Sequence, residues 1–335
     1  MNMWGYLLRT TMSAALAASV AIGSVHAAGT ESLLQHPASK VFIDQMVAEH
    51  GFPREDLEVV FAGARIRPSV IERITRPAEA LPWYQYRKIF MIEKRIRGGA
   101  DFWRSHRETL ARAEREFGVA PEVIVAIIGV ETQYGKYKGK DPVLESLATL
   151  AFDYPKRSRF FKSELEEFLL LSREEGFEPL AVKGSYAGAM GLPQFISSSY
   201  RRLAIDFDGD GQRNLLSNPS DAIGSVANYL NKHGWRRGES VAVEARVKGK
   251  KYGALIDKGI KPSTPVGDLA GFGVTPLGAV RGNRAALVAM EASDKEEFWL
   301  GFDNFYAITR YNHSALYALA VHQLSQAIRE TFESP

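Results

Sequence analysis

Residues 121–132 read Pro121-Glu122-Val123-Ile124-Val125-Ala126-Ile127-Ile128-Gly129-Val130-Glu131-Thr132, an apolar run with a carboxylate near its end. In a helix, the residues three, four and seven positions before Glu131 are all isoleucines, so the carboxylate shares an apolar face. Burying an unpaired carboxylate costs several kcal/mol and raises its pKa, which gives the protonated state that a general acid needs. Alternatively, Glu131 lies just past the helix end and points into water. The stretch alone does not decide between the two.

The composition is that of an ordinary globular protein. The chain has 335 residues, of which 45% are hydrophobic and 24% charged, enough for two or three domains. The formal net charge of +3 is spread over many acidic and basic residues and gives no case for a nucleic-acid partner. The chain has no cysteine, which excludes disulfides, thiolate metal sites and cysteine nucleophiles.

The N-terminus has the pattern of a secretory signal. Arg9 precedes the apolar residues 12–22, and Val25-His26-Ala27 offers small residues at a cleavage site. We therefore interpret residues 1–27 as a signal peptide. No later stretch reaches the roughly 18 apolar residues of a membrane span. Because no cysteine is present to carry a lipid, we expect an exported, soluble, periplasmic protein.

Periodicity divides the rest of the chain. Residues 28–118 show helical patterns, including one helix expected over Asp101–Phe117, and we expect the C-terminal helix, residues 314–335, to complete this helical domain. Residues 119–240 carry most of the functional motifs. Residues 241–302 alternate and are rich in glycine and proline, which predicts a small antiparallel β domain. Residues 303–335 return to helix, so the fold class is α+β and mainly α.

A glycine-rich loop follows in the segment Lys183-Gly184-Ser185-Tyr186-Ala187-Gly188-Ala189-Met190-Gly191-Leu192-Pro193-Gln194-Phe195. Small residues allow the backbone to approach a ligand closely, and the aromatic and amide side chains can stack and hydrogen-bond. The alternative is a tight connection that binds no ligand.

An acidic loop spans residues 206–221. Oxygens at positions 1, 3 and 5, a glycine at position 6 and a backbone carbonyl at position 7 resemble the first half of an EF-hand calcium loop. Position 12 is Ser217 instead of glutamate, so the nearest carboxylate that could close the site is Asp221. We expect a structural Ca²⁺, with Na⁺ as an alternative ion, bound by Asp206, Asp208, Asp210, Gln212 and Asp221; a plain acidic turn is the other interpretation.

Several of these motifs together resemble the B family of lytic murein transglycosylases. The motifs are Gly129–Thr132, Tyr154-Pro155, Lys183–Gly191, Gln194-Phe195, Asp221–Tyr229 and Arg310-Tyr311-Asn312. The resemblance runs from about Lys40 to Leu324. It implies a goose-lysozyme-like helical core in residues 119–240, with an added helical domain, a small sheet domain and an ion loop of calcium type.

The resemblance also implies a reaction. The family cleaves the β-1,4 bond between N-acetylmuramic acid and N-acetylglucosamine without water and leaves a 1,6-anhydro ring. Glu131 matches its single catalytic residue, acting first as acid and then as base. Side chains implied to bind or orient the substrate are Tyr86, Tyr154, Lys156, Arg157, Ser185, Gln194, Phe195, Tyr229, Tyr311, Asn312 and Tyr317.

Two other functions stay open at this point. One is a hydrolytic muramidase of lysozyme type, which would use a water and a second carboxylate such as Asp141, Glu145 or Asp153. The other is a peptidoglycan-binding scaffold without catalysis. We expect a monomer that binds glycan strands and needs no catalytic cofactor; proteins of cell-wall synthesis or division are further candidate partners, which the sequence does not identify.

Overall fold

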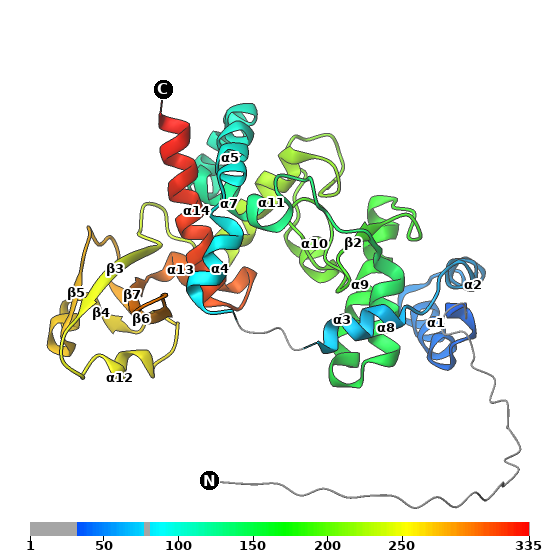
Figure 1. The fold of residues 1–335 in the computed structure, drawn as a ribbon. Coiled ribbons are helices and arrows are strands. Elements are labelled where there is room, and N and C mark those ends of the chain that lie inside the picture. Colours follow the sequence, from blue (N-terminus) through cyan, green and yellow to red (C-terminus); the bar gives the residue numbers. More distant parts are fainter. Residues whose placement is uncertain (1–31, 77–80, 335) are drawn as a thin grey trace, which may run out of the picture.

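The structure is a computed structural model that describes residues 32–76 and 81–334. The interpreted signal peptide, residues 1–27, lies outside these ranges. Within them, no helix combines the length and the apolar character that crossing a membrane requires. The described chain forms an elongated arrangement of helices with a β-sheet at one end (Figure 1).

The first helices lie at the end of the molecule opposite the sheet (Figure 1). They are the 3-10 turn η1 (Leu33–Gln35), α1 (Pro37–His50), α2 (Arg54–Gly63) and α3 (Pro68–Thr75). They pack beside α8 (Val143–Asp153) and α9 (Ser158–Glu175), which are joined by the 3-10 turn η2 (Pro155–Arg157). Ion pairs across this contact join Arg67 to Glu145 and Arg73 to Asp141.

The next three helices lie elsewhere, near the middle of the molecule. These are α4 (Trp83–Phe90), α5 (Glu93–Ser105) and α6 (Arg107–Phe117), and they pack against α7 (Pro121–Thr132), α11 (Pro219–Lys232) or the C-terminal α14 (Ala315–Glu333). The described residues 32–76 and 81–118 therefore contribute to two regions, while the division into domains stays a prediction. The single helix expected over Asp101–Phe117 is wrong: the backbone of His106, with φ −119° and ψ 27°, separates α5 from α6.

Helix α7 is the central element of the helical region. Pro121 occupies its first turn, where the absent N–H costs nothing, and Gln133 ends it with a left-handed φ of 48°. Helices α5, α6, α11 and α14 surround it. Because it is covered on several sides, residues on all its faces are apolar and buried.

The short helix α10 (Ser197–Leu203) leads from the glycine-rich loop toward the acidic loop and α11. A two-stranded sheet pairs β1 (Asp141–Pro142) with β2 (Lys183–Gly184) and joins the start of α8 to the start of the glycine-rich loop. At the end of α7, Thr132 donates to the Leu192 carbonyl of the glycine-rich loop, whereas Phe207 of the acidic loop packs against Arg112 and Phe117 of α6.

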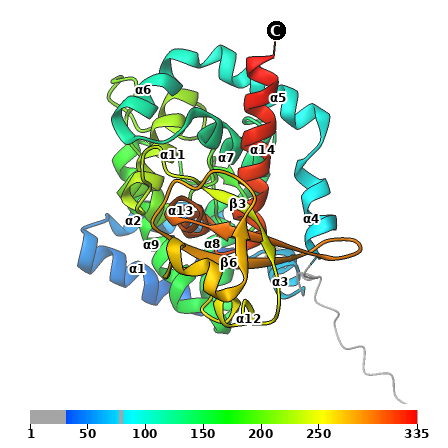
Figure 2. The same cartoon turned by 90° about the vertical axis from the view of Figure 1, so that its left-hand side faces the viewer.

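The five-stranded antiparallel sheet has the strand order β4-β6-β7-β3-β5. Its strands are β3 (Ala242–Val247), β4 (Thr264–Pro265), β5 (Val274–Pro276), β6 (Arg284–Glu291) and β7 (Glu296–Gly301), with α12 (Gly253–Ile256) and the 3-10 helix η3 (Val266–Phe272) in its connections. It has its own buried cluster, which includes Leu287, Leu300 and Phe302. Helix α13 (Asp303–Tyr311) returns the chain to the helical region, as both views show (Figures 1 and 2). This confirms the expected α+β, mainly α class.

Candidate active site

Glu131 is the second-last residue of α7 and is half-buried. Its Oε1 accepts a 2.6 Å hydrogen bond from the hydroxyl of Tyr317, which reaches it from α14. Burial raises the pKa of Glu131 to about 7, and the hydrogen bond from Tyr317 acts in the opposite direction. Near neutral pH both protonation states are therefore populated, which suits a group that gives a proton and then takes one.

Three tyrosines surround this carboxylate. Tyr317 stacks on Tyr311 with ring centroids 6.4 Å apart and planes 7° from parallel. Burial raises the pKa of both hydroxyls well above the usual value, so both stay protonated at neutral pH. The pKa of Tyr86 on α4 is raised by burial and, secondly, by the charge of Glu131, which places its hydroxyl within electrostatic range of the carboxylate.

An aromatic cluster continues from Tyr311 away from Glu131. The rings of Phe195, Tyr229 and Tyr311 lie 4.8 to 5.8 Å apart, and His233 stacks on Tyr229 at 4.1 Å. The Tyr229 hydroxyl donates to the Arg310 carbonyl at 2.6 Å, and the Tyr311 hydroxyl donates to the carbonyl of Pro193. Both hydroxyls already bind backbone carbonyls. They therefore hold these segments in place beside Glu131 and are not free to donate to a ligand.

The polar side chains of the glycine-rich loop also serve the backbone. Ser185 Oγ accepts hydrogen bonds from the N–H groups of Ala187 and Ala189, and Gln194 Nε2 donates to the carbonyls of Lys138 and Gly191. A Cβ on Gly191 would lie 2.4 Å from the Leu215 carbonyl oxygen. Close packing against protein backbone therefore accounts for this glycine without any ligand.

The remaining predicted substrate residues are Tyr154, Lys156, Arg157 and Asn312. Arg157 lies over Phe160 at 4.1 Å, and Lys156 is exposed on the same turn, beside Tyr154. The exposed Asn312 directly follows α13. In the described part of the chain, no hydrogen bond or ion pair joins these side chains to Glu131, so their roles stay predictions.

The carboxylates considered as a second catalytic group are each held by a cation or imidazole. Arg73 donates to both oxygens of Asp141, at 2.6 and 3.0 Å. Glu145 pairs with Arg67 and accepts from the backbone N–H of Arg65. Asp153 lies 3.1 Å from His36 Nε2. These carboxylates tie α3 and the start of α1 to the neighbouring helices.

The acidic loop brings three of its predicted ligands together. Ligand oxygens of Asp206, Asp208 and Asp210 lie within 4.8 Å of one another, and Gly209 and Gly211 adopt left-handed φ values of 82° and 91°. Hard carboxylate oxygens in a tight turn fit a Ca²⁺ ion.

Asp221, the fourth predicted carboxylate ligand, lies within electrostatic range of Asp208 and Asp206, and its role as a ligand stays a prediction. It is fully buried, and its two oxygens accept 2.7 Å hydrogen bonds from the N–H groups of Phe207 and Asn214. Asp221 therefore joins the two ends of the loop and is not in the group of three carboxylates. The Gln212 side chain is exposed, and its backbone N–H donates to Asp210 Oδ1.

Sequence reasoning missed Tyr134. Its hydroxyl donates to the Arg95 carbonyl at 2.7 Å, and its ring fills the space that a side chain at Gly98, Gly99 or Gly129 would need. Tyr134 thus packs the end of α7 against α5 and fixes where Glu131 emerges. The glycines at these positions were the available signal, since a helix interior disfavours glycine unless something packs closely there.

Comparison with known proteins places this arrangement in a family. Residues 35–326 match the family model described as transglycosylase SLT domain. The chain is 43% identical over 304 residues to membrane-bound lytic murein transglycosylase B of Escherichia coli (strain K12), an alignment that covers 88% of this chain and 83% of that protein.

Solved structures of lytic transglycosylases have a fold similar to that of this chain. The soluble lytic transglycosylase SltB1 from Pseudomonas aeruginosa is 45% identical with a TM-score of 0.84, covering 89% of this chain and 100% of that one. The Escherichia coli lytic transglycosylase Slt35 in complex with calcium is 42% identical with a TM-score of 0.81, covering 90% and 95%. SltB3 from Pseudomonas aeruginosa in complex with NAG-anhNAM-pentapeptide is 32% identical with a TM-score of 0.79, covering 87% and 78%.

The lysozyme-like fold of these neighbours agrees with the helical core found here. On the family model, the sequence identity and the shared fold, the chain belongs to the B family of lytic murein transglycosylases.

Proposed function

We propose that Glu131 is the acid and the base with which this lytic transglycosylase cleaves peptidoglycan. The observation that carries the proposal is the pKa of about 7, raised by burial, on a carboxyl group that keeps part of its surface exposed. A group with this pKa can donate a proton at neutral pH and accept one in the next step.

In the first step, protonated Glu131 gives its proton to the oxygen that joins C1 of N-acetylmuramic acid to N-acetylglucosamine, and the C1–O bond breaks. In the second step, the Glu131 carboxylate takes the proton of the C6 hydroxyl on the same muramic acid, and that oxygen bonds to C1. The product has a 1,6-anhydro ring, no water is consumed, and Glu131 is again protonated. An internal nucleophile needs no separate binding, which lowers the barrier.

The paired state of the other carboxylates supports this scheme over hydrolysis. A lysozyme-type muramidase uses a second carboxylate as base or nucleophile. Asp141, Glu145 and Asp153 are each engaged by a side chain from the first helical segment, so none is a free base. The complex of SltB3 with NAG-anhNAM-pentapeptide shows that a relative binds an anhydro sugar, in line with this product.

The Tyr317 hydroxyl supports the second step. It donates to Oε1 of Glu131 and so stabilises the carboxylate form that must accept the C6 proton. We propose that the partly exposed Tyr311 faces the sugars, with the buried Phe195 and Tyr229 packed behind it, while Lys156 and Arg157 contact the carboxylates of peptide stems.

The experiment is product analysis on purified sacculi with the wild type and the variant Glu131→Gln. The wild type is expected to release muropeptides lighter by one water than reducing-end products, as measured by mass spectrometry. Glu131→Gln is expected to reduce turnover at least a thousandfold, because glutamine can neither donate nor accept the proton, while retaining sacculus binding. Reducing-end products from the wild type would favour the hydrolytic muramidase, and full activity in the variant would remove Glu131 from its role.

We also propose that Asp206, Asp208 and Asp210 hold a structural Ca²⁺. The clustered oxygens support this, as does the calcium complex of the related Slt35. Such an ion would neutralise the loop that precedes α11 and takes no part in proton transfer. Finally, the N-terminal pattern of residues 1–27 and the peptidoglycan-cleaving family support export to the periplasm.

A further inference from the structure

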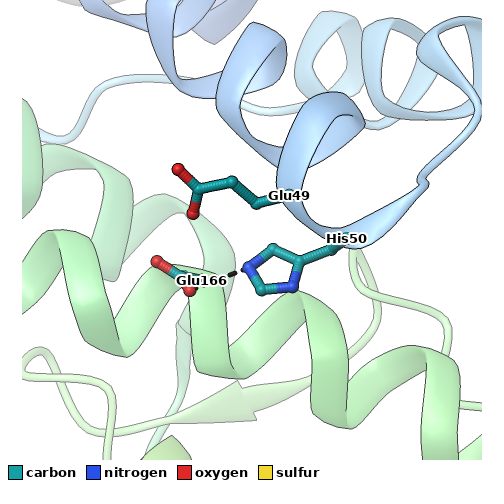
Figure 3. A group of neighbouring side chains, drawn as sticks. All are labelled: Glu49, His50 and Glu166. Atoms are coloured by element: carbon teal, nitrogen blue, oxygen red, sulfur yellow. Dashed lines mark hydrogen bonds and ion pairs between the residues drawn. The ribbon is translucent and has the colours of Figure 1, made fainter.

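A second group of potential metal ligands lies far in sequence from the acidic loop. Glu49 and His50 end α1, and Glu166 lies on the neighbouring α9. One ligand atom from each residue lies within 4.8 Å of the other two, and His50 Nε2 is 2.8 Å from Glu166 Oε1. Figure 3 shows the two carboxylates and the imidazole converging between the two helices.

Contacts outside the group hold these side chains in place. Gln45 Nε2 donates to Glu49 Oε2 at 3.1 Å, and Arg173 on α9 donates to the His50 carbonyl at 2.9 Å. The Arg173 guanidinium also lies over the ring of Phe52 at 4.1 Å. Such surrounding bonds orient ligand groups and reduce the rearrangement that metal binding requires.

The ion pair between His50 and Glu166 accounts for only two of the three residues in the group. The same kind of pair occurs between His36 and Asp153, 3.1 Å apart, where the described residues supply no third ligand. At His50 a second carboxylate, Glu49, approaches the pair, and two carboxylates this close repel each other unless a cation lies between them. The approach of Glu49, which is exposed and accepts a hydrogen bond from Gln45, is therefore the feature that the His50–Glu166 pair does not account for.

The ligand chemistry favours a transition metal. One imidazole and two carboxylates suit Zn²⁺, whose bonds of about 2.0–2.1 Å place ligand atoms roughly 3.4 Å apart in a tetrahedron, with water in the fourth position. The 2.8 Å contact between His50 and Glu166 needs to open only slightly for this. The C-terminal end of α1 also carries partial negative charge, which favours a cation there.

We propose that Glu49, His50 and Glu166 bind one divalent transition-metal ion, Zn²⁺ by preference, which joins the C-terminal end of α1 to α9. The site differs from the acidic loop in its chemistry, because Ca²⁺ prefers an all-oxygen ligand set and Zn²⁺ accepts imidazole. It is independent of Glu131 and of the proposed reaction.

The test is isothermal titration of the full, tag-free protein with Zn²⁺ while excess Ca²⁺ is present. The wild type is expected to bind one Zn²⁺, and Co²⁺ is expected to give a visible absorption band with an imidazole ligand. Glu49→Gln is expected to weaken the affinity for Zn²⁺ at least tenfold. The unfolding temperature without metal should not change, since the His50–Glu166 contact remains. His36→Gln, which removes the matched pair, is expected to bind Zn²⁺ like the wild type.

His50→Gln is expected to abolish the Co²⁺ band. The proposal is overturned if the wild type binds no Zn²⁺ at micromolar concentrations. It is equally overturned if Glu49→Gln or His50→Gln binds Zn²⁺ as tightly as the wild type, which would place the ion elsewhere. Because Glu49→Gln keeps the contact between the helices, its result does not depend on whether His50→Gln folds normally.

Discussion

At the scale of single residues, the pKa of Glu131 results from two opposing contacts. Burial removes water from the carboxylate and raises its pKa, while the Tyr317 hydroxyl stabilises the charged form and lowers it. A pKa near 7 suits the proposed mechanism, in which Glu131 serves as both acid and base. Either contact alone would favour one step at the expense of the other.

Tyr317→Phe tests this balance. Removing the hydroxyl leaves the ring against Tyr311 but removes the bond that stabilises the carboxylate, so the pKa of Glu131 should rise further. The limb on which kcat/KM falls with rising pH, expected near pH 7 in the wild type, should shift upward by about one unit. The measurement is a pH–rate profile on solubilised glycan strands.

Tyr86→Phe is the control for that profile. Tyr86 lies within electrostatic range of Glu131, but among the described contacts it donates no hydrogen bond to Glu131, so the variant should leave the limb where it is in the wild type. An unchanged limb in Tyr317→Phe would show that the bond to Tyr317 does not set the pKa.

At the scale of elements, the acidic loop and α11 form one unit. Asp221, in the first turn of α11, accepts from the N–H group of Phe207, which lies between Asp206 and Asp208, and from that of Asn214, which follows the three clustered carboxylates. Tyr200 on α10 adds a second support, because its hydroxyl donates to the Arg213 carbonyl and accepts from the N–H of Leu215. The loop is therefore shaped by protein contacts before any ion binds.

Two variants separate ion binding from this support. Asp208→Ala should abolish the rise in unfolding temperature that Ca²⁺ causes, with little change in the chelated protein, because Asp208 is exposed. Asp221→Ala should lower the unfolding temperature even with chelator, because it leaves two backbone N–H groups without their acceptor, at a cost of about 2 kcal/mol or more. Thermal melts with Ca²⁺ and with chelator measure both effects.

No response of the wild type to millimolar Ca²⁺ would leave the plain acidic turn as the better interpretation. Equal behaviour of the two variants in chelator would contradict the supporting role of Asp221.

At the scale of the whole molecule, the buried acid destabilises the folded state. The pKa of Glu131 is about 4.5 when unfolded and about 7 in the fold. Below about pH 4.5 both states are protonated and the site costs nothing. Between these values the unfolded chain loses its proton first, so stability falls as the pH rises, and above about 7 the loss is complete.

Glu131→Gln should therefore stabilise the protein at high pH. The gain in the free energy of unfolding should be near zero below about pH 4.5 and should grow to at most about 3.5 kcal/mol above pH 7, at about 1.4 kcal/mol per pKa unit. Glutamine can still accept the Tyr317 hydrogen bond, so little else changes. Urea denaturation of both proteins from pH 4 to 8.5 measures the difference, and a gain that does not vary with pH would contradict the elevated pKa.

Local sequence patterns predicted the parts of the fold that depend on short-range interactions. The apolar run after Pro121 predicted α7, and the alternation in residues 241–247 predicted a strand of the antiparallel sheet. The break at His106 was missed, because residues 101–117 keep a helical pattern on both sides of it. Short-range patterns do not specify the partners of α3 or of α4–α6, since α8 and α7 with α14 lie far along the chain.

The sequence by itself determined the family motifs, the position of Glu131 at the end of an apolar helix and the clustering of Asp206, Asp208 and Asp210, because these depend on neighbours within a few turns. The tertiary structure decided whether Glu131 would hold a proton, since the Tyr317 that contacts it lies 186 residues away. It also decided that Asp221 supports the loop, and that Glu166 faces His50 across 116 residues. Burial and pairing depend on which helices pack together, and periodicity in one segment does not specify its partner.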